Sequence, residues 1–189
     1  MPIKLAAAPK DAMNILETGI QHLAAGVDDT LGRIEGLALP HRVFHLGLDS
    51  LVRGKPVAKV AKHVGWRFQL VDRKKRAIAA GELVKTRAGL QFASISQGPH
   101  ATDTRAQTAA ERWSRRSKAD YEVALLRIPG AYCVALWLRN TDGTPDAFVP
   151  IAPCPSLTPN KIYREEEFRA ALLPDATKQL EAPRDGRHH

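Results

Sequence analysis

Apolar and polar residues follow two different periods along this chain, and each period predicts a kind of secondary structure. Over residues 10–25 apolar side chains recur every three or four positions, which is the spacing of an amphipathic helix. They are Met13, Leu16, Ile20 and Leu23. Over residues 66–70 apolar and polar residues alternate, which is typical of a strand with one buried face. Residues 89–96 alternate again through Leu90, Phe92 and either Ser94 or its neighbours.

Two further helices are predicted in the second half of the chain. The first spans about 102–118, where Thr102 or Asp103 can accept hydrogen bonds from the first free amides. The second spans about 163–173 and closes the domain. Between them lie two apolar segments, 121–128 and 131–139, which are predicted to be strands joined by a turn.

The segment 131–139 is apolar on both of its alternating faces, since Val134 and Leu136 lie on one and Cys133 and Trp137 on the other. Such a strand is expected at the centre of a sheet that is covered on both sides. The helices can cover one face. The second cover must then come from the N-terminal helix, from a curled sheet or from a partner subunit.

These elements predict an α+β fold with a mainly antiparallel sheet, because strands occur in runs with one helix between two runs. We expect an N-terminal helical segment over 1–40, an α+β domain over 41–173 and a loosely ordered tail over 174–189. The terminal His188 and His189 can be native or added residues, and no inference depends on them.

The chain carries a formal net charge of +8, and most of the excess lies in one part of it. Residues 41–80 contain ten Lys and Arg against two Asp and Glu. A basic region can bind an anionic partner such as a nucleic acid, or it can simply be a soluble surface. Composition alone favours the soluble surface.

Eight basic residues are the candidate contacts to nucleic acid or to another anion. They are Arg73, Lys74, Lys75 and Arg76 in a predicted turn, and Arg105, Arg112, Arg115 and Arg116 on the predicted helix 102–118. At 100° per residue three of these arginines share one helix face and Arg115 adjoins it. Trp113 lies on the opposite, apolar flank, so it is predicted to pack inward and not to stack on bases. We therefore favour a helix that covers a sheet over a helix that binds phosphates.

A second candidate site is the loop that leads from the strand 89–96 into the helix 102–118. Free amides at this helix start can hold an anion, with help from Arg105. The candidate ligand residues are Ser96, Gly98, His100 and Thr102. The alternative, which we favour, is an ordinary capped connection.

No pattern typical of a metal site, a cofactor site or a catalytic centre is found in the sequence, so none is predicted. His41 and His45 would lie ~13 Å apart on a strand, too far to bind one ion easily. Cys133 lies in an apolar strand and Cys154 between prolines, so neither is expected to be catalytic. Two cysteines do not indicate a disulfide framework, and we expect a reduced, cytoplasmic protein. No apolar stretch reaches the ~20 residues that span a bilayer, so no membrane partner is expected.

The sequence favours a non-enzymatic intracellular interaction protein, either an adaptor or an assembly subunit, whose partner is another protein or a second copy. One alternative is a nucleic-acid-binding module with a basic face formed by residues 53–76 and 105–118. Another is a small enzyme or anion-ligand binder near residues 96–105.

Overall fold

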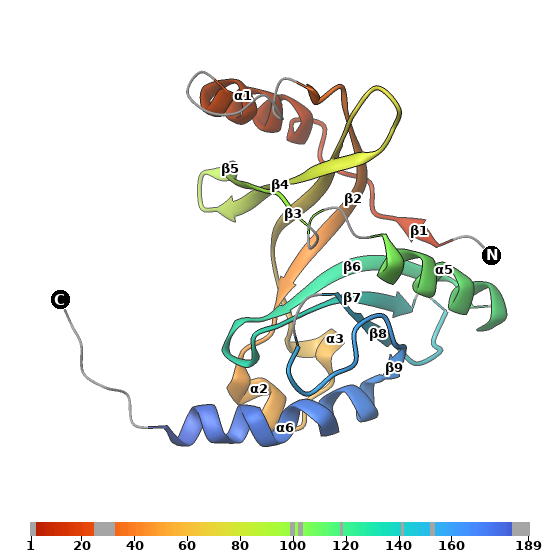
Figure 1. Cartoon of the computed structure of the whole chain (residues 1–189). Helices are drawn as coiled ribbons and strands as arrows, with labels where there is room; N and C mark the ends of the chain where they lie inside the picture. The colour runs from red at the N-terminus through yellow and green to blue at the C-terminus, as the bar shows by residue number, and fades with distance from the viewer. Residues whose placement is uncertain are drawn as a thin grey trace.

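One bent β-sheet runs through the part of the chain that the computed structural model describes, as Figure 1 shows. The described residues are 3–24, 33–98, 101, 104–117, 119–140, 142–151 and 154–182. The strands are β1 (Lys4–Leu5), β2 (Gly36–His45), β3 (Lys62–Val71), β4 (Ala77–Thr86), β5 (Gly89–Ser96), β6 (Tyr121–Ile128), β7 (Cys133–Asn140), β8 (Ala147–Pro150) and β9 (Tyr163–Arg164). The helices are α1 (Ala12–Ala24), α2 (Leu48–Val52), α3 (Val57–Val60), α5 (Arg105–Ser117), α6 (Glu165–Glu181) and the 3-10 helix η2 (Pro129–Ala131). This arrangement confirms the predicted α+β fold with a mostly antiparallel sheet.

Strand β2 connects the two halves of this sheet. The strands follow the order β5-β4-β3-β2-β6-β7-β8-β9, and β1 pairs with β6 outside this path. β2 pairs with β3 over most of its length, but only residues 42–45 pair with β6, in parallel. In Figure 1, therefore, β3, β4, β5 and α1 form an upper half, while β6 to β9, α5 and α6 form a lower half.

Different helices cover the apolar surfaces of the sheet. In the upper half, Leu16 and Ile20 of α1 belong to one core cluster with Trp66 and Phe68 of β3. In the lower half, α5 covers one face of the sheet and α6 covers the other, as Figure 1 shows. Leu16 and Ile20 are buried, as the apolar spacing predicted, and so are the apolar residues of the strand at 66–70. Met13 and Leu23, which share that spacing, are exposed instead.

Strand β7 confirms the prediction of a central strand with two buried faces. Leu136 and Leu138 belong to the core beneath α5, whereas Cys133 and Trp137 belong to the core beneath α6. The element that covers the second face of β7 is neither the N-terminal helix, nor a curled sheet, nor a partner subunit. The two later helices bury both faces of β7, and α1 packs on the upper half.

The N-terminal segment contributes strands as well as a helix. β1 lies before α1, and β2 begins at Gly36, inside the segment 1–40 that was expected to be helical. Pro40, at the end of the segment that was expected to be helical, lies inside β2, although proline cannot donate a hydrogen bond to a ladder. In the structure, the pairing of β2 with β3 shifts register beside it, where Leu39 adopts a φ of 47°.

Helix α6 continues beyond its predicted end at residue 173. It runs through Pro174 to Glu181, although a proline inside a helix removes one backbone hydrogen bond. Phe168, Leu172 and Ala176 are fully buried at four-residue spacing, and this packing spans the proline. Residues 174–181 are therefore helical, while 183–189 lie outside the described residues. None of the described helices, α6 included, is long and apolar enough to cross a membrane.

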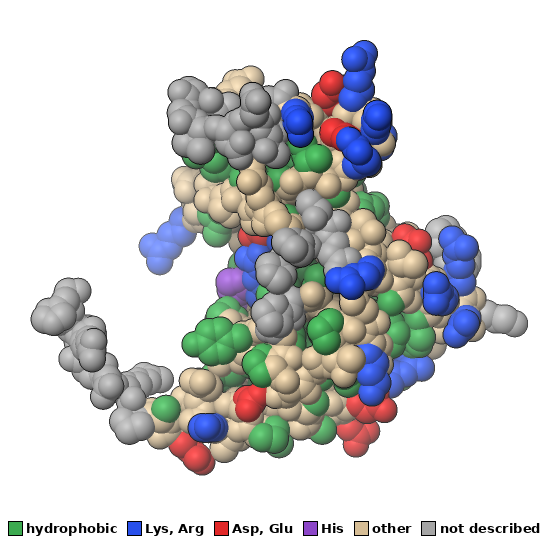
Figure 2. Space-filling view, viewed as in Figure 1, with side chains coloured by type: hydrophobic (Ala, Val, Ile, Leu, Met, Phe, Trp, Pro, Cys, Tyr) green, Lys and Arg blue, Asp and Glu red, His purple; other side chains and the backbone are tan. Residues whose placement is uncertain are grey.

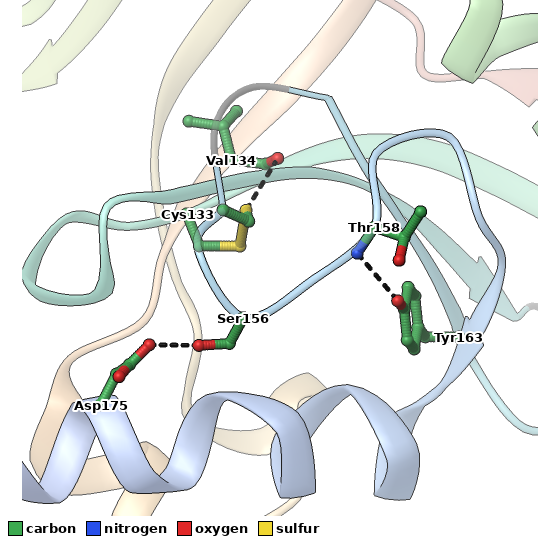
Figure 3. Close-up of a disulfide and its surroundings, with 7 residues drawn as sticks. Cys133, Val134, Ser156, Thr158, Tyr163 and Asp175 are labelled. Carbon is green, nitrogen blue, oxygen red and sulfur yellow. Dashed lines mark hydrogen bonds between the residues drawn. A yellow bond between two sulfur atoms is a disulfide. The ribbon is translucent and has the colours of Figure 1, made fainter.

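A disulfide joins Cys133 and Cys154, which corrects the expectation of reduced cysteines. Both residues are buried, one at the start of β7 and the other in the loop between β8 and β9 (Figure 3). Spacing in sequence did not indicate this pair. The pairing of β8 with β7 brings the loop back to the start of β7, where the Ile151 amide donates to the Val134 carbonyl at 2.9 Å. The cytoplasmic location remains a prediction.

Side chains hold the same loop against its neighbours, as Figure 3 shows. Ser156 donates a hydrogen bond to Asp175 of α6. The Thr158 amide donates to the Tyr163 hydroxyl at 2.9 Å. The loop is thus attached to β7, to α6 and to β9.

Loss of the disulfide is expected to lower the free energy of unfolding by about 3 kcal/mol, because a cross-link between residues 21 positions apart restricts the unfolded chain. Urea unfolding of a Cys133→Ala, Cys154→Ala double variant measures this loss. Reductant should lower the stability of the wild type to a similar degree and leave the double variant unchanged. A wild-type stability that does not respond to reductant would contradict the expectation.

Candidate functional site

Helix α1 packs closely on the upper half of the sheet because two glycines leave room for larger side chains. A Cβ atom at Gly19 of α1 would overlap the ring of Phe92 on β5. A Cβ atom at Gly81 of β4 would overlap the side chain of Leu16 on α1. Each glycine therefore receives a side chain from the opposite element, and α1 is held directly above β4 and β5.

A β-bulge determines which residues of β5 face α1. Leu83 pairs with Phe92 and Glu82 pairs with Ser94, so Ala93 is an extra residue on β5. Phe92 and Ile95, which are three positions apart, consequently both pack against the core beneath α1. The bulge resolves the ambiguity left by the sequence pattern after Phe92.

An apolar groove lies between α1 and the part of β5 that precedes the bulge. Its volume is about 550 Å³. Ile15 and Leu23 line it from α1, and Leu90 and Phe92 line it from β5. Leu23 is 43% exposed, so part of its apolar surface is open at the groove. The size and the lining match those of sites that bind small molecules or peptide side chains.

The outer side of β5 borders this groove and is an edge of the sheet. β5 is the last strand in the sheet order, and β4 is its partner on the inner side. Natural proteins usually protect such edges with lysine, proline, a bulge or a covering element. The sequence of β5, GLQFASIS, has neither a charged residue nor a proline, so the bulge at Ala93 is its main protection. Main-chain groups before the bulge are therefore positioned to pair with another strand.

A second candidate site, which is polar, lies where the two halves of the sheet meet. Arg67 of β3 donates to Glu82 of β4 at 3.0 Å, and Arg127 of β6 donates to the same carboxylate. Burial, followed by the nearby Arg67, lowers the pKa of His41 from 6.5 to about 4. Burial also lowers the pKa of Arg67, although Glu82 opposes that shift. Perturbed groups of this kind occur both in functional sites and in structural ion pairs.

The space beside this cluster favours a structural role. His41 and Arg67 line a cavity of about 30 Å³, which is room for roughly one water molecule and too little for an organic ligand. The Nε2 atom of His41 is buried there and has no hydrogen-bond partner among the residues that the structure describes. Among the residues that the structure describes, no group of three or more His, Cys, Asp or Glu could hold a metal ion.

The predicted basic residues lie in two separate places. Arg73, Lys74, Lys75 and Arg76 lie in or beside the turn between β3 and β4, where Arg76 donates to Asp72 at 2.6 Å. Arg105, Arg112, Arg115 and Arg116 are exposed on α5. Figure 2 shows basic side chains over the β3–β4 turn at the top and over α5 at the right, with mostly uncharged surface between them. Their role in binding anions remains a prediction.

Trp113 of α5 faces inward, as its helical position predicted. It packs on the core beneath α5, with its ring centroid 5.0 Å from that of Tyr121. The guanidinium of Arg164 lies 4.9 Å from the Trp113 ring centroid on its other side. This tryptophan is therefore part of the packing of α5 on the sheet.

The predicted ligand loop is described only in part. Ser96 ends β5, and its buried hydroxyl has no hydrogen-bond partner within the described part of the chain. Gly98 has a φ of 88°, which favours glycine. His100 and Thr102 lie outside the described residues. The loop therefore remains a prediction.

No protein-family model, curated protein or solved structure matches this chain. The site must therefore be judged from its own geometry, and the groove beside β5 has the clearest features of a binding site. Sequence reasoning missed it because the groove depends on the contact of Gly19 with Phe92. The absence of charge and proline in residues 89–96 was the one local signal that could have indicated it.

The fit of Gly19 against Phe92 can be tested by a double-mutant cycle. Alanine normally stabilises a helix interior by about 1 kcal/mol relative to glycine, but Gly19→Ala should destabilise this protein by about 1–3 kcal/mol because its methyl group displaces the ring. In a Phe92→Ala background the same change should be neutral or stabilising. Urea unfolding of the four proteins measures the coupling. Equal effects of Gly19→Ala in both backgrounds would contradict the packing.

The lowered pKa of His41 predicts a loss of stability in acid. The unfolded chain binds this proton near pH 6.5 and the folded protein only near pH 4, so stability falls as the pH drops through this window. Between pH 7 and pH 4 the wild type should lose about 3 kcal/mol more than His41→Leu, which has no proton to bind. Urea unfolding of both proteins across this range checks the difference. Parallel curves would show that His41 does not carry the effect.

Proposed function

We propose that this protein is an interaction module that binds an extended segment of a partner protein along the edge strand β5. The observation that carries this proposal is an edge strand without charge or proline beside an apolar groove of about 550 Å³. An added strand can satisfy the outward main-chain groups of such an edge, while its side chains fill the neighbouring groove.

The dimensions of the groove suggest the length of the bound segment. Residues of α1 line it from Asn14 to Leu23, which is about 14 Å of helix at 1.5 Å per residue. An extended strand covers that distance with about four or five residues. Because side chains alternate along a strand, two or three of them can enter the groove. We therefore expect a short motif with apolar residues at alternate positions.

A segment of another protein fits this site better than a second copy of β5. In a second copy, Leu90 and Phe92 already pack against their own α1. Phe92 in particular is held against Gly19, so its ring cannot enter the groove of a second copy. Pairing of two β5 strands would therefore leave both grooves unfilled.

The alternative as a nucleic-acid-binding module has weaker support. It would use the exposed arginines of α5, among them Arg112 and Arg116. On the face shown in Figure 2 the basic side chains over α5 do not join those of the β3–β4 turn, whereas this alternative needs one basic face formed by both. A salt-dependent affinity for DNA or RNA that falls when the arginines of α5 are replaced by alanine would favour this alternative.

Peptide selection with a matched pair of variants tests the proposal. A displayed library of random linear peptides should yield binders with apolar residues at alternate positions. Leu23→Asp places a charge in the groove and should weaken the binding of these peptides at least tenfold, as measured by titration calorimetry. Leu180→Asp is the control, because Leu180 is similarly exposed at 39% and lies on α6, at the other end of the molecule (Figure 1).

The main-chain contribution has its own control. Methylation of alternate peptide nitrogens should abolish binding in one register and spare it in the other, because only every second amide faces the edge strand. Selection that yields no binder, or binders that tolerate Leu23→Asp as well as Leu180→Asp, would contradict the proposal. A dimer that dissociates on Leu23→Asp would indicate a second copy as the occupant.

A further inference from the structure

A second pocket continues the groove toward the turn between β4 and β5. Its volume is about 490 Å³, and Leu90 lines both this pocket and the apolar groove. Pro9 and Asp11, which precede α1, form one side of it. Asp11, Ile15 and Thr18 follow one another at three- and four-residue spacing, so the two pockets lie along the same side of the helix. The second pocket also extends across the sheet to Arg42 of β2, so a strand lying against β5 would pass only its end at Lys85, Gly89 and Leu90.

The two pockets differ in chemistry. The groove beside Phe92 is apolar, whereas Arg42, His63 and Lys85 line the second pocket. Trp66 lies beneath them and is 5% exposed, with the Arg42 guanidinium 5.9 Å from its ring centroid. The ring is thus covered by protein and is not a platform for stacking. Lys85 and Asp11 are the exposed charged residues of the lining, and Arg42 and His63 are half-buried.

The charges around the second pocket leave a positive excess. Arg42 lies 3.5 Å from Glu122, which also accepts a hydrogen bond from Arg139. Lys85 is exposed and forms no ion pair among the residues that the structure describes. Asp11 is the one carboxylate in the lining.

The pKa of His63, which lines this pocket, is affected by the same basic residues. Burial is the main cause that lowers the pKa of His63, while its hydrogen bond with the Gly65 carbonyl opposes the shift. Lys85, Arg42 and Arg139 lower this pKa further by their charge. Glu122 offsets the charge of Arg42 and Arg139, so Lys85 is the cation with which a negative group placed here would pair.

We propose that the segment bound along β5 carries an Asp or Glu side chain at the end that lies beside the β4–β5 turn, where Lys85 receives its carboxylate. This inference rests on the proposed function and adds the charge of the partner to it. The partner motif is then short and extended, with alternating apolar residues followed or preceded by an acidic one. Lys85 selects the acid, because its ammonium has no competing ion pair among the described residues.

Charge exchange between peptide and protein tests this inference. Peptides selected on the wild type should carry Asp or Glu at one end of the apolar motif, and replacing this residue with Gln or Asn should weaken binding about three- to tenfold. Lys85→Glu should weaken binding of the acidic peptide by at least as much. A peptide with Lys at the acidic position should bind Lys85→Glu more tightly than it binds the wild type. Lys178→Glu on α6 is the control with the same change in net charge, and it should leave both affinities unchanged.

The outcomes separate this inference from the function on which it depends. If the Gln or Asn peptide binds as tightly as the acidic one and Lys85→Glu has no effect, the inference is wrong. The proposed function still stands in that case, provided that Leu23→Asp abolishes binding. If Lys178→Glu weakens binding as much as Lys85→Glu, the net charge of the protein and not the pocket is responsible, and the inference is again wrong. Failure to obtain any peptide binder overturns both.

Discussion

The parallel pairing of β2 with β6 is the connection on which the two halves of the molecule depend. It involves residues 42–45 of β2 and 124–127 of β6. The first part of β2 pairs with β3 but not with β6, so β3, β4 and β5 extend away from the lower half. This separation leaves β5 as the last of the described strands on that side of the sheet, distant from α5 and α6 (Figure 1). The position of the groove beside β5 therefore follows from where β2 leaves β6.

On each face of this junction one carboxylate lies between two arginines. Glu82 bridges Arg67 and Arg127 on the side of α5. On the opposite face Glu122 lies 3.0 Å from Arg139 and 3.5 Å from Arg42. The ion pairs of Glu82 join β3 and β4 of the upper half to β6. Those of Glu122 join β2 to β6 and β7. Partly buried ion pairs add little to stability on average, but a wrong alignment of the strands would leave their charges unpaired, so they favour this single register.

The sequence predicted the elements whose signal is local and missed the features that join distant parts of the chain. Helical spacing identified Leu16 as a core residue, and the two apolar faces of β7 predicted its central position. The Cys133–Cys154 pair, in contrast, depends on how the loop after β8 returns to β7. The groove depends on a contact between α1 and β5, and the bulge at Ala93 has no glycine to mark it. Periodicity reports burial within one element, whereas these sites arise from the arrangement of several.

The bulge at Ala93 also has a consequence for solubility. A flat, uncharged edge of eight residues would be a template on which further chains could pair and polymerise. The extra residue interrupts the spacing of the main-chain groups, so a regular strand can align with only one short part of β5 at a time. Growth into an extended intermolecular sheet is thereby hindered, while the first residues of the strand stay accessible. One inserted alanine therefore limits the length of β5 along which another strand can pair without a break.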